Sequence, residues 1–89
     1  MGNLMRLELH VMAEQEAFAR NRMSWTPALA EQFDYQGGGI WFSVGTYQTN
    51  EEQDKKSIKQ LQKFTDEYMK EFGITEYYTE INEFDGWID

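Results

Sequence analysis

The sequence predicts an α+β fold, in which helices cover a small three-stranded sheet in the order β-α-(α)-β-α-β. Apolar residues recur at helical spacing between about residues 51 and 72, whereas three other stretches have the alternation or the aromatic content typical of strands. Three short strands with so many aromatic residues would not persist alone, so we expect the helices to cover the sheet. Without a linker or an internal repeat, residues 1–89 are expected to form a single domain.

The first strand is expected over residues 5–12. Every second position there is apolar, as in a strand with one buried face: Met5, Leu7, Leu9 and Val11. A helix over about residues 13–23 should follow, because this stretch is rich in helix formers. One long helix through both stretches is the alternative, since Leu4, Leu7, Val11 and Phe18 also approximate one helical face.

The next part of the chain predicts a short helix and a second strand. Pro27 suits the first turn of a helix over residues 27–33. The run from Gly37 to Gly39 then interrupts the chain before a strand over residues 40–48, which contains Trp41, Phe42, Val44 and Tyr47. Gly45 inside this strand indicates a bulge or a close approach of another backbone.

The clearest element is a long amphipathic helix over about residues 51–72. Its apolar face consists of Ile58, Leu61, Thr65, Tyr68 and Phe72, widened by Phe64 and Met69. Thr49 and Glu52 have the spacing of a capping box at its start, and Asn50 is the alternative cap. Gly73 suits the left-handed conformation that follows a helix end. A third strand is expected over residues 74–84, where aromatic residues and threonine are mixed with acids.

The sequence contains no recognisable catalytic or metal-binding constellation. With no cysteine and a single histidine, His10, it predicts neither disulfides nor a zinc site. Neighbouring acids on one strand face lie too far apart to chelate a metal without a second element. We therefore expect no enzyme and no cofactor. A signal peptide and a membrane-length apolar run are also lacking, which favours a soluble, cytoplasmic protein.

The negative charge is concentrated in the last quarter of the chain. Eight acids and one base give residues 66–89 a net charge of −7, whereas eight acids and seven bases give residues 1–65 a net charge of −1. Such charge repels nucleic acid and anionic membranes, so a basic protein is the expected partner. Large rings, which are enriched at interface hot spots, lie among these acids. The predicted partner-binding residues are Glu71, Glu76, Tyr78, Glu80, Glu83, Phe84, Asp85 and Trp87.

A row of carboxylates can imitate part of the phosphate charge of a nucleic acid. In size, acidity and lack of catalytic residues, the chain resembles as a class the phage-encoded inhibitors of defence nucleases, including anti-CRISPR and antirestriction proteins. It also resembles the immunity proteins that neutralise toxin nucleases. The resemblance implies an inhibitor that masks a basic, nucleic-acid-binding surface. The alternatives are a homo-oligomeric accessory domain, such as a homodimer with an aromatic self-interface, and acidity that serves only solubility.

Overall fold

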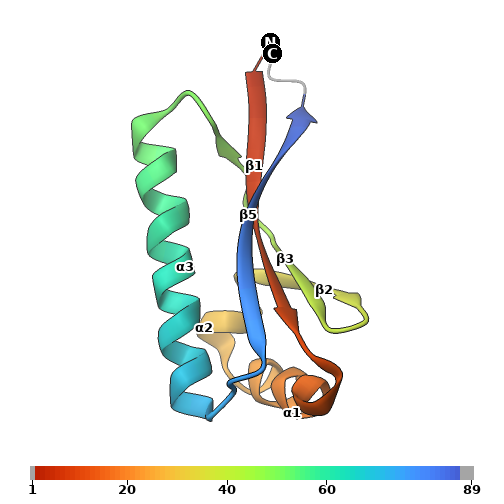
Figure 1. Cartoon of the computed structure of the whole chain (residues 1–89). Coiled ribbons are helices and arrows are strands. Elements are labelled where there is room, and N and C mark those ends of the chain that lie inside the picture. The colour runs from red at the N-terminus through yellow and green to blue at the C-terminus, as the bar shows by residue number, and fades with distance from the viewer. Residues whose placement is uncertain (1, 87–89) are drawn as a thin grey trace.

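The computed structural model describes residues 2–86 and has the α+β fold that the sequence predicts (Figure 1). In chain order the elements are β1 (Gly2–Val11), α1 (Ala13–Ser24), α2 (Pro27–Ala30), β2 (Phe33–Gly37), β3 (Ile40–Ser43), β4 (Tyr47–Gln48), α3 (Glu52–Phe72) and β5 (Tyr77–Gly86). The first strand and the helix after it are separate elements, so the alternative of one long helix is wrong. The prediction of a three-stranded sheet is also wrong, because the sheet has five antiparallel strands.

One of the two additional strands, β2, lies where the sequence predicted the end of a short helix and a loop. Phe33 pairs with Ser43, and Asp34 pairs with Phe42. Only Phe33 of this strand is buried, so its local sequence lacks the alternation that marks a half-buried strand. The glycine run forms the turn of the β2–β3 hairpin. Gly37, Gly38 and Gly39 all have positive φ, at 93°, 61° and 80°, a region that side chains disfavour.

The other additional strand arises because the predicted strand over residues 40–48 is divided into β3 and β4. Both segments pair with β1, but the ladder is interrupted between them. The Ser43 side chain spans part of this interruption, since its hydroxyl oxygen accepts a hydrogen bond from the Leu7 amide at 3.0 Å and donates to the Gly45 carbonyl at 3.0 Å. The irregularity that Gly45 indicates therefore lies between β3 and β4 and separates these two strand segments.

The central strand of the sheet is β1. Its partner on one side is β5, which pairs along the whole strand from Gly2↔Gly86 to Val11↔Tyr77. Its partners on the other side are β3 and β4, and β2 lies outside β3. If β3 and β4 are counted as two segments of one strand, the element order is β-α-β-β-α-β, the split β-α-β arrangement. This arrangement places the first and last strands side by side.

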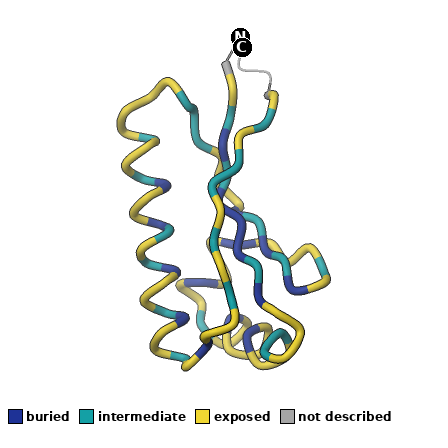
Figure 2. Tube along the Cα trace, viewed as in Figure 1, coloured by how far each residue is buried: buried dark blue, intermediate teal, exposed yellow. Residues whose placement is uncertain are grey.

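The hydrophobic core lies between the helices and one face of the sheet. The odd-numbered residues of β1 from Met5 to Val11 are buried there, together with residues from all three helices: Ala19, Met23, Leu29, Ile58, Leu61 and Met69. Figure 1 shows α3 running alongside the β1–β5 pair, and Figure 2 shows its buried residues recurring along one side. No helix within residues 2–86 is long and apolar enough to cross a membrane.

The two ends of α3 differ in how well the sequence predicts them. Gly73 has a φ of 78° and ends the helix in the left-handed conformation, as expected. The predicted capping box is wrong, because the side chain of the residue at the N-cap, Glu51, makes no capping hydrogen bond. Thr49 instead donates its hydroxyl to the Asn3 carbonyl at 3.1 Å, and thus ties the start of the helix to β1.

Candidate functional site

The sheet has a second face, opposite the helices, which we call the open face. Because side chains alternate along a strand, the even-numbered residues of β1 point away from the core. Residues directly opposite on antiparallel strands share a face, so the pairing of β1 with β3 and β5 defines the rest of the surface. The open face comprises Leu4, Arg6, Glu8 and His10 of β1, Ile40 and Phe42 of β3, and Tyr78, Glu80, Asn82 and Phe84 of β5.

Arg6 lies between two aromatic rings on this face. Its guanidinium carbon is 3.9 Å from the centroid of the Phe42 ring and 5.0 Å from that of Phe84. Both distances are within the range of a cation–π contact. The same guanidinium donates from Nε to Oε2 of Glu8 at 3.2 Å. Arg6 therefore connects the apolar part of the open face with its acidic part.

The acidic part consists of two carboxylates and an imidazole. Glu8 and Glu80 are directly opposite each other on β1 and β5. His10 follows two positions after Glu8 on the same face, and its Nε2 is 3.1 Å from Glu8 Oε1. The imidazole is stacked on the Tyr78 ring, with centroids 4.6 Å apart and planes 9° from parallel. The ligand atoms of Glu8, His10 and Glu80 all lie within 4.8 Å of one another.

Glu8 is an ionised carboxylate in a poorly hydrated position. Its side chain is only 10% exposed. Burial raises the pKa of this carboxyl, but hydrogen bonding from Asn82, His10 and Arg6, together with the positive charge of Arg6, outweighs burial and holds the pKa below its ordinary value. Although like charges directly opposite on neighbouring strands repel, the groups that favour the charged form prevail at Glu8, which lies opposite Glu80.

The structure distributes the predicted partner-binding residues over both faces of β5 and beyond it. Tyr78, Glu80 and Phe84 lie on the open face, whereas Glu83 and Asp85 alternate to the other face, opposite Met5 and Asn3. Glu71 lies in the last turn of α3, and Glu76 lies in the connection just before β5. Trp87 lies outside the described residues. Five of the eight residues are thus brought together on one strand.

The outer edge of β5 adds to this surface. Within residues 2–86, β5 pairs with β1 alone. Its acids flank that edge from both sides, with Glu80 on the open face and Glu83 and Asp85 on the opposite face, all of them exposed. Tyr78, which is 48% exposed, adds a ring beside them. An edge strand offers free backbone donors and acceptors, and charged side chains on it restrict which chains can pair there.

Sequence reasoning did not find the contribution of β1 to the site. Arg6, Glu8 and His10 are the polar positions of an alternating strand, and locally they indicate only a solvated face. Their role depends on the pairing of β1 with β5, which joins residues about 70 positions apart along the chain. The alternation itself predicts that these three side chains share a face, and this signal was available in the sequence.

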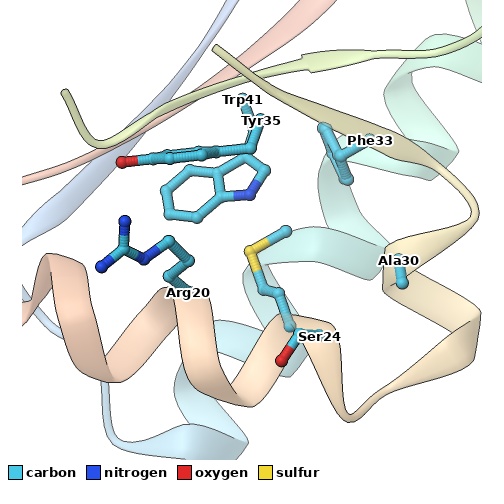
Figure 3. A pocket seen from close by; sticks show the side chains of 7 residues that line it. Arg20, Ser24, Ala30, Phe33, Tyr35 and Trp41 are labelled. Atoms are coloured by element: carbon cyan, nitrogen blue, oxygen red, sulfur yellow. The ribbon is translucent and has the colours of Figure 1, made fainter. Parts of the chain in front are cut away.

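A small cavity lies elsewhere, between α1, α2 and the β2–β3 hairpin (Figure 3). Its volume is about 170 Å³, enough for one apolar side chain. Figure 3 shows the rings of Trp41 and Tyr35 lying together above Arg20; the two ring centroids are 4.7 Å apart. Arg20 is already engaged, with Nε 3.7 Å from the Glu16 carboxylate. The residues that line the cavity bring together no nucleophile and base.

Comparisons with known protein families, curated proteins and solved structures give no match to this chain. The arrangement of the fold does not by itself imply an activity, since one fold carries many functions.

Proposed function

We propose that this protein is a binding protein that covers a basic, nucleic-acid-binding surface of another protein, with β5 and the open face as its contact surface. The observation that carries the proposal is the composition of β5. Its ten residues contain three acids and no base, together with Tyr77, Tyr78 and Phe84. Because the strand is at the edge of the sheet, its acids are available to a partner from both faces.

The partner class follows from electrostatics. Carboxylates on both sides of one exposed strand attract lysine and arginine side chains and repel nucleic acid. Proteins that hold nucleic acid present such basic side chains to phosphates. Charge attraction would accelerate association, and the exposed ring of Tyr78 would contribute contact area that slows dissociation. Among basic partners, we propose the nucleases that phage inhibitors and immunity proteins neutralise. We propose a binding role for the protein and no catalytic one.

A competition assay tests the proposal. Candidate nucleases are bound to labelled duplex DNA, and the fluorescence anisotropy of the DNA is followed as the protein is added. We expect a cognate nuclease to be displaced from the DNA at about 0.05 M salt. The affinity of the protein for the same nuclease, measured by calorimetry without DNA, should weaken as salt is raised to about 0.5 M, because screening shortens the range of charge attraction. An affinity that is insensitive to salt would contradict an electrostatic contact.

Two charge-reversal variants locate the surface. Glu80→Lys with Glu83→Lys changes β5, whereas Glu31→Lys, just after α2, with Glu67→Lys in α3 makes the same change in net charge elsewhere. All four residues are exposed. We expect the β5 variant to lose about tenfold or more in affinity and the control to change much less. Equal losses would show that only net charge matters, and no loss in either would exclude the acids from the interface.

Self-association through β5 is the alternative that the free strand edge permits. The acids on this strand count against it, because two antiparallel copies would bring six carboxylates together with no base among them. Light scattering at high protein concentration distinguishes the two proposals. If β5 binds a basic partner, the protein alone is expected to be a monomer. A dimer that persists at high salt would favour the accessory-domain alternative.

A further inference from the structure

We infer that Glu8, His10 and Glu80 form a binding site for a divalent transition-metal ion on the open face. The inference goes beyond the proposed function. It starts from the mixed donor set, since an imidazole nitrogen and two carboxylate oxygens from neighbouring strands lie within 4.8 Å of one another. Acids along one strand face are too widely spaced to chelate an ion. The structure supplies the second strand that chelation needs.

The spacing of the donors fits coordination of a single ion. Protein nitrogen and oxygen ligands lie about 2.0–2.2 Å from ions such as Zn²⁺, so two ligands of one ion are about 3.0 Å apart at a right angle and about 3.4 Å apart at the tetrahedral angle. The distance between Glu8 Oε1 and His10 Nε2 is 3.1 Å. An ion between them would replace the proton that now joins the two atoms. Glu80 is exposed, so its carboxylate can rotate towards the same point without disturbing the core.

Glu8 and His10 are held in place by neighbouring groups. Arg6 contacts Oε2 of Glu8 and leaves Oε1 to His10, while the Asn82 amide hydrogen-bonds Glu8 and donates to Oε2 of Glu80 at 3.5 Å. The stacked Tyr78 ring fixes the plane of the His10 imidazole. Metal ligands are commonly oriented by such outer contacts. The nearly buried Glu8 carboxylate and the oriented imidazole distinguish this set from an ordinary cluster of surface acids.

The donor types select the class of ion. Imidazole suits zinc, iron, nickel and copper, whereas carboxylates alone suit magnesium, calcium and manganese. The imidazole therefore favours Zn²⁺ over Mg²⁺ and Ca²⁺, whereas the two carboxylates also admit Mn²⁺. The ion would also carry positive charge into the space between two directly opposed carboxylates, where repulsion otherwise acts. Three ligands on an uncovered sheet face would leave the remaining coordination positions to water.

Calorimetric titration of the protein alone with ZnCl₂, and separately with MgCl₂, tests this inference without any partner protein. We expect saturable binding of one Zn²⁺ per chain and much weaker binding of Mg²⁺. Glu80→Gln and His10→Gln should each weaken Zn²⁺ binding about tenfold or more, since each removes one of three ligands. Glu83→Gln is the matched control, because it removes the same charge from the other face of β5.

Three results would overturn the site. These are the absence of saturable Zn²⁺ binding, equal affinity for Mg²⁺, and equal weakening by Glu80→Gln and Glu83→Gln. The last two would indicate diffuse attraction of cations to an acidic strand. A second measurement uses Mn²⁺, whose paramagnetism should broaden the backbone NMR signals of Glu8, His10 and Glu80 before those of Glu83. Circular dichroism confirms that each variant is folded, so a lost signal reports on binding.

Discussion

The turn before β3 provides the sharpest test of how the sheet is assembled. Gly39 has a φ of 80°, and a Cβ added there would lie 2.3 Å from the carbonyl oxygen of Val11. Ordinary van der Waals contact begins near 3.4 Å, so the backbone would have to move by about 1 Å. The carbonyl oxygen of Gly39 also accepts a hydrogen bond from the Val11 amide at 2.8 Å, and such a movement would break this bond. Gly39→Ala should therefore loosen the junction between β3 and β1.

The expected cost combines three contributions. The left-handed conformation costs a residue with a side chain about 1–2 kcal/mol. Loss of the hydrogen bond adds about 0.5–1.5 kcal/mol. Residual overlap between the added Cβ and the Val11 carbonyl adds strain to these two contributions, so the free energy of unfolding should fall by at least about 1.5 kcal/mol. For a domain of this size each kcal/mol lowers Tm by about 4–8 °C, which gives a decrease of at least about 6 °C.

Thermal unfolding followed by circular dichroism measures this decrease, with Gly38→Ala as the control. Gly38 also has positive φ, at 61°, but a Cβ there meets no atom within 4 Å. The control should therefore show only the conformational cost, and its Tm should lie clearly above that of Gly39→Ala. Equal Tm values for the two variants would refute the close approach of Gly39 to Val11, and with it the placement of the hairpin against β1.

Two further predictions concern the core and the contact between α3 and β5. Met69→Ala should lower the free energy of unfolding by about 2–5 kcal/mol in urea titrations, because Met69 is fully buried, whereas exposed Met12→Ala should change it by less than about 0.5 kcal/mol. Burial is the main cause that raises the pKa of Tyr77 to about 12. The hydrogen bond from the Tyr77 hydroxyl to the Asp66 carboxylate and the negative charge of that carboxylate raise it further. Because the pKa of Tyr77 is higher in the folded than in the unfolded state, this residue stabilises the fold at pH values below the unfolded pKa of 10.0. The contribution is lost as the pH rises towards 12. In an absorbance titration of tyrosinate, Asp66→Asn should lower the pKa of Tyr77 towards its ordinary value; an unchanged curve would contradict the contact.

Elements with a strong local pattern could be predicted from the sequence. The helix that became α3 has a sustained apolar face, and its buried residues Ile58, Leu61, Thr65 and Met69 all belong to that predicted face. The strand β1 was recognised from strict alternation over its odd-numbered residues. In both elements the buried face is encoded in consecutive residues, so no knowledge of the partners is needed.

The remaining parts depend on contacts between distant residues. The strand β2 has one buried residue, and it is a strand because it pairs with β3 across the glycine turn. The division of β3 from β4 depends on the Ser43 hydroxyl, which can bond to Leu7 only once β1 is in place. The site follows the same rule, because the register that sets Glu8 opposite Glu80 is a property of the assembled sheet.

The environment of Glu8 differs from that of acids exposed elsewhere on the molecule. Glu67 of α3 is exposed, whereas the Glu8 side chain is 10% exposed and faces Glu80. Proteins accept such local costs mainly where function requires them. Arg6 already supplies positive charge on one side of Glu8, and a basic side chain of a partner or a metal ion would supply more between Glu8 and Glu80. The two proposals therefore describe competing occupants of one surface, because an ion held by Glu8 and Glu80 would remove charge that attracts a basic protein.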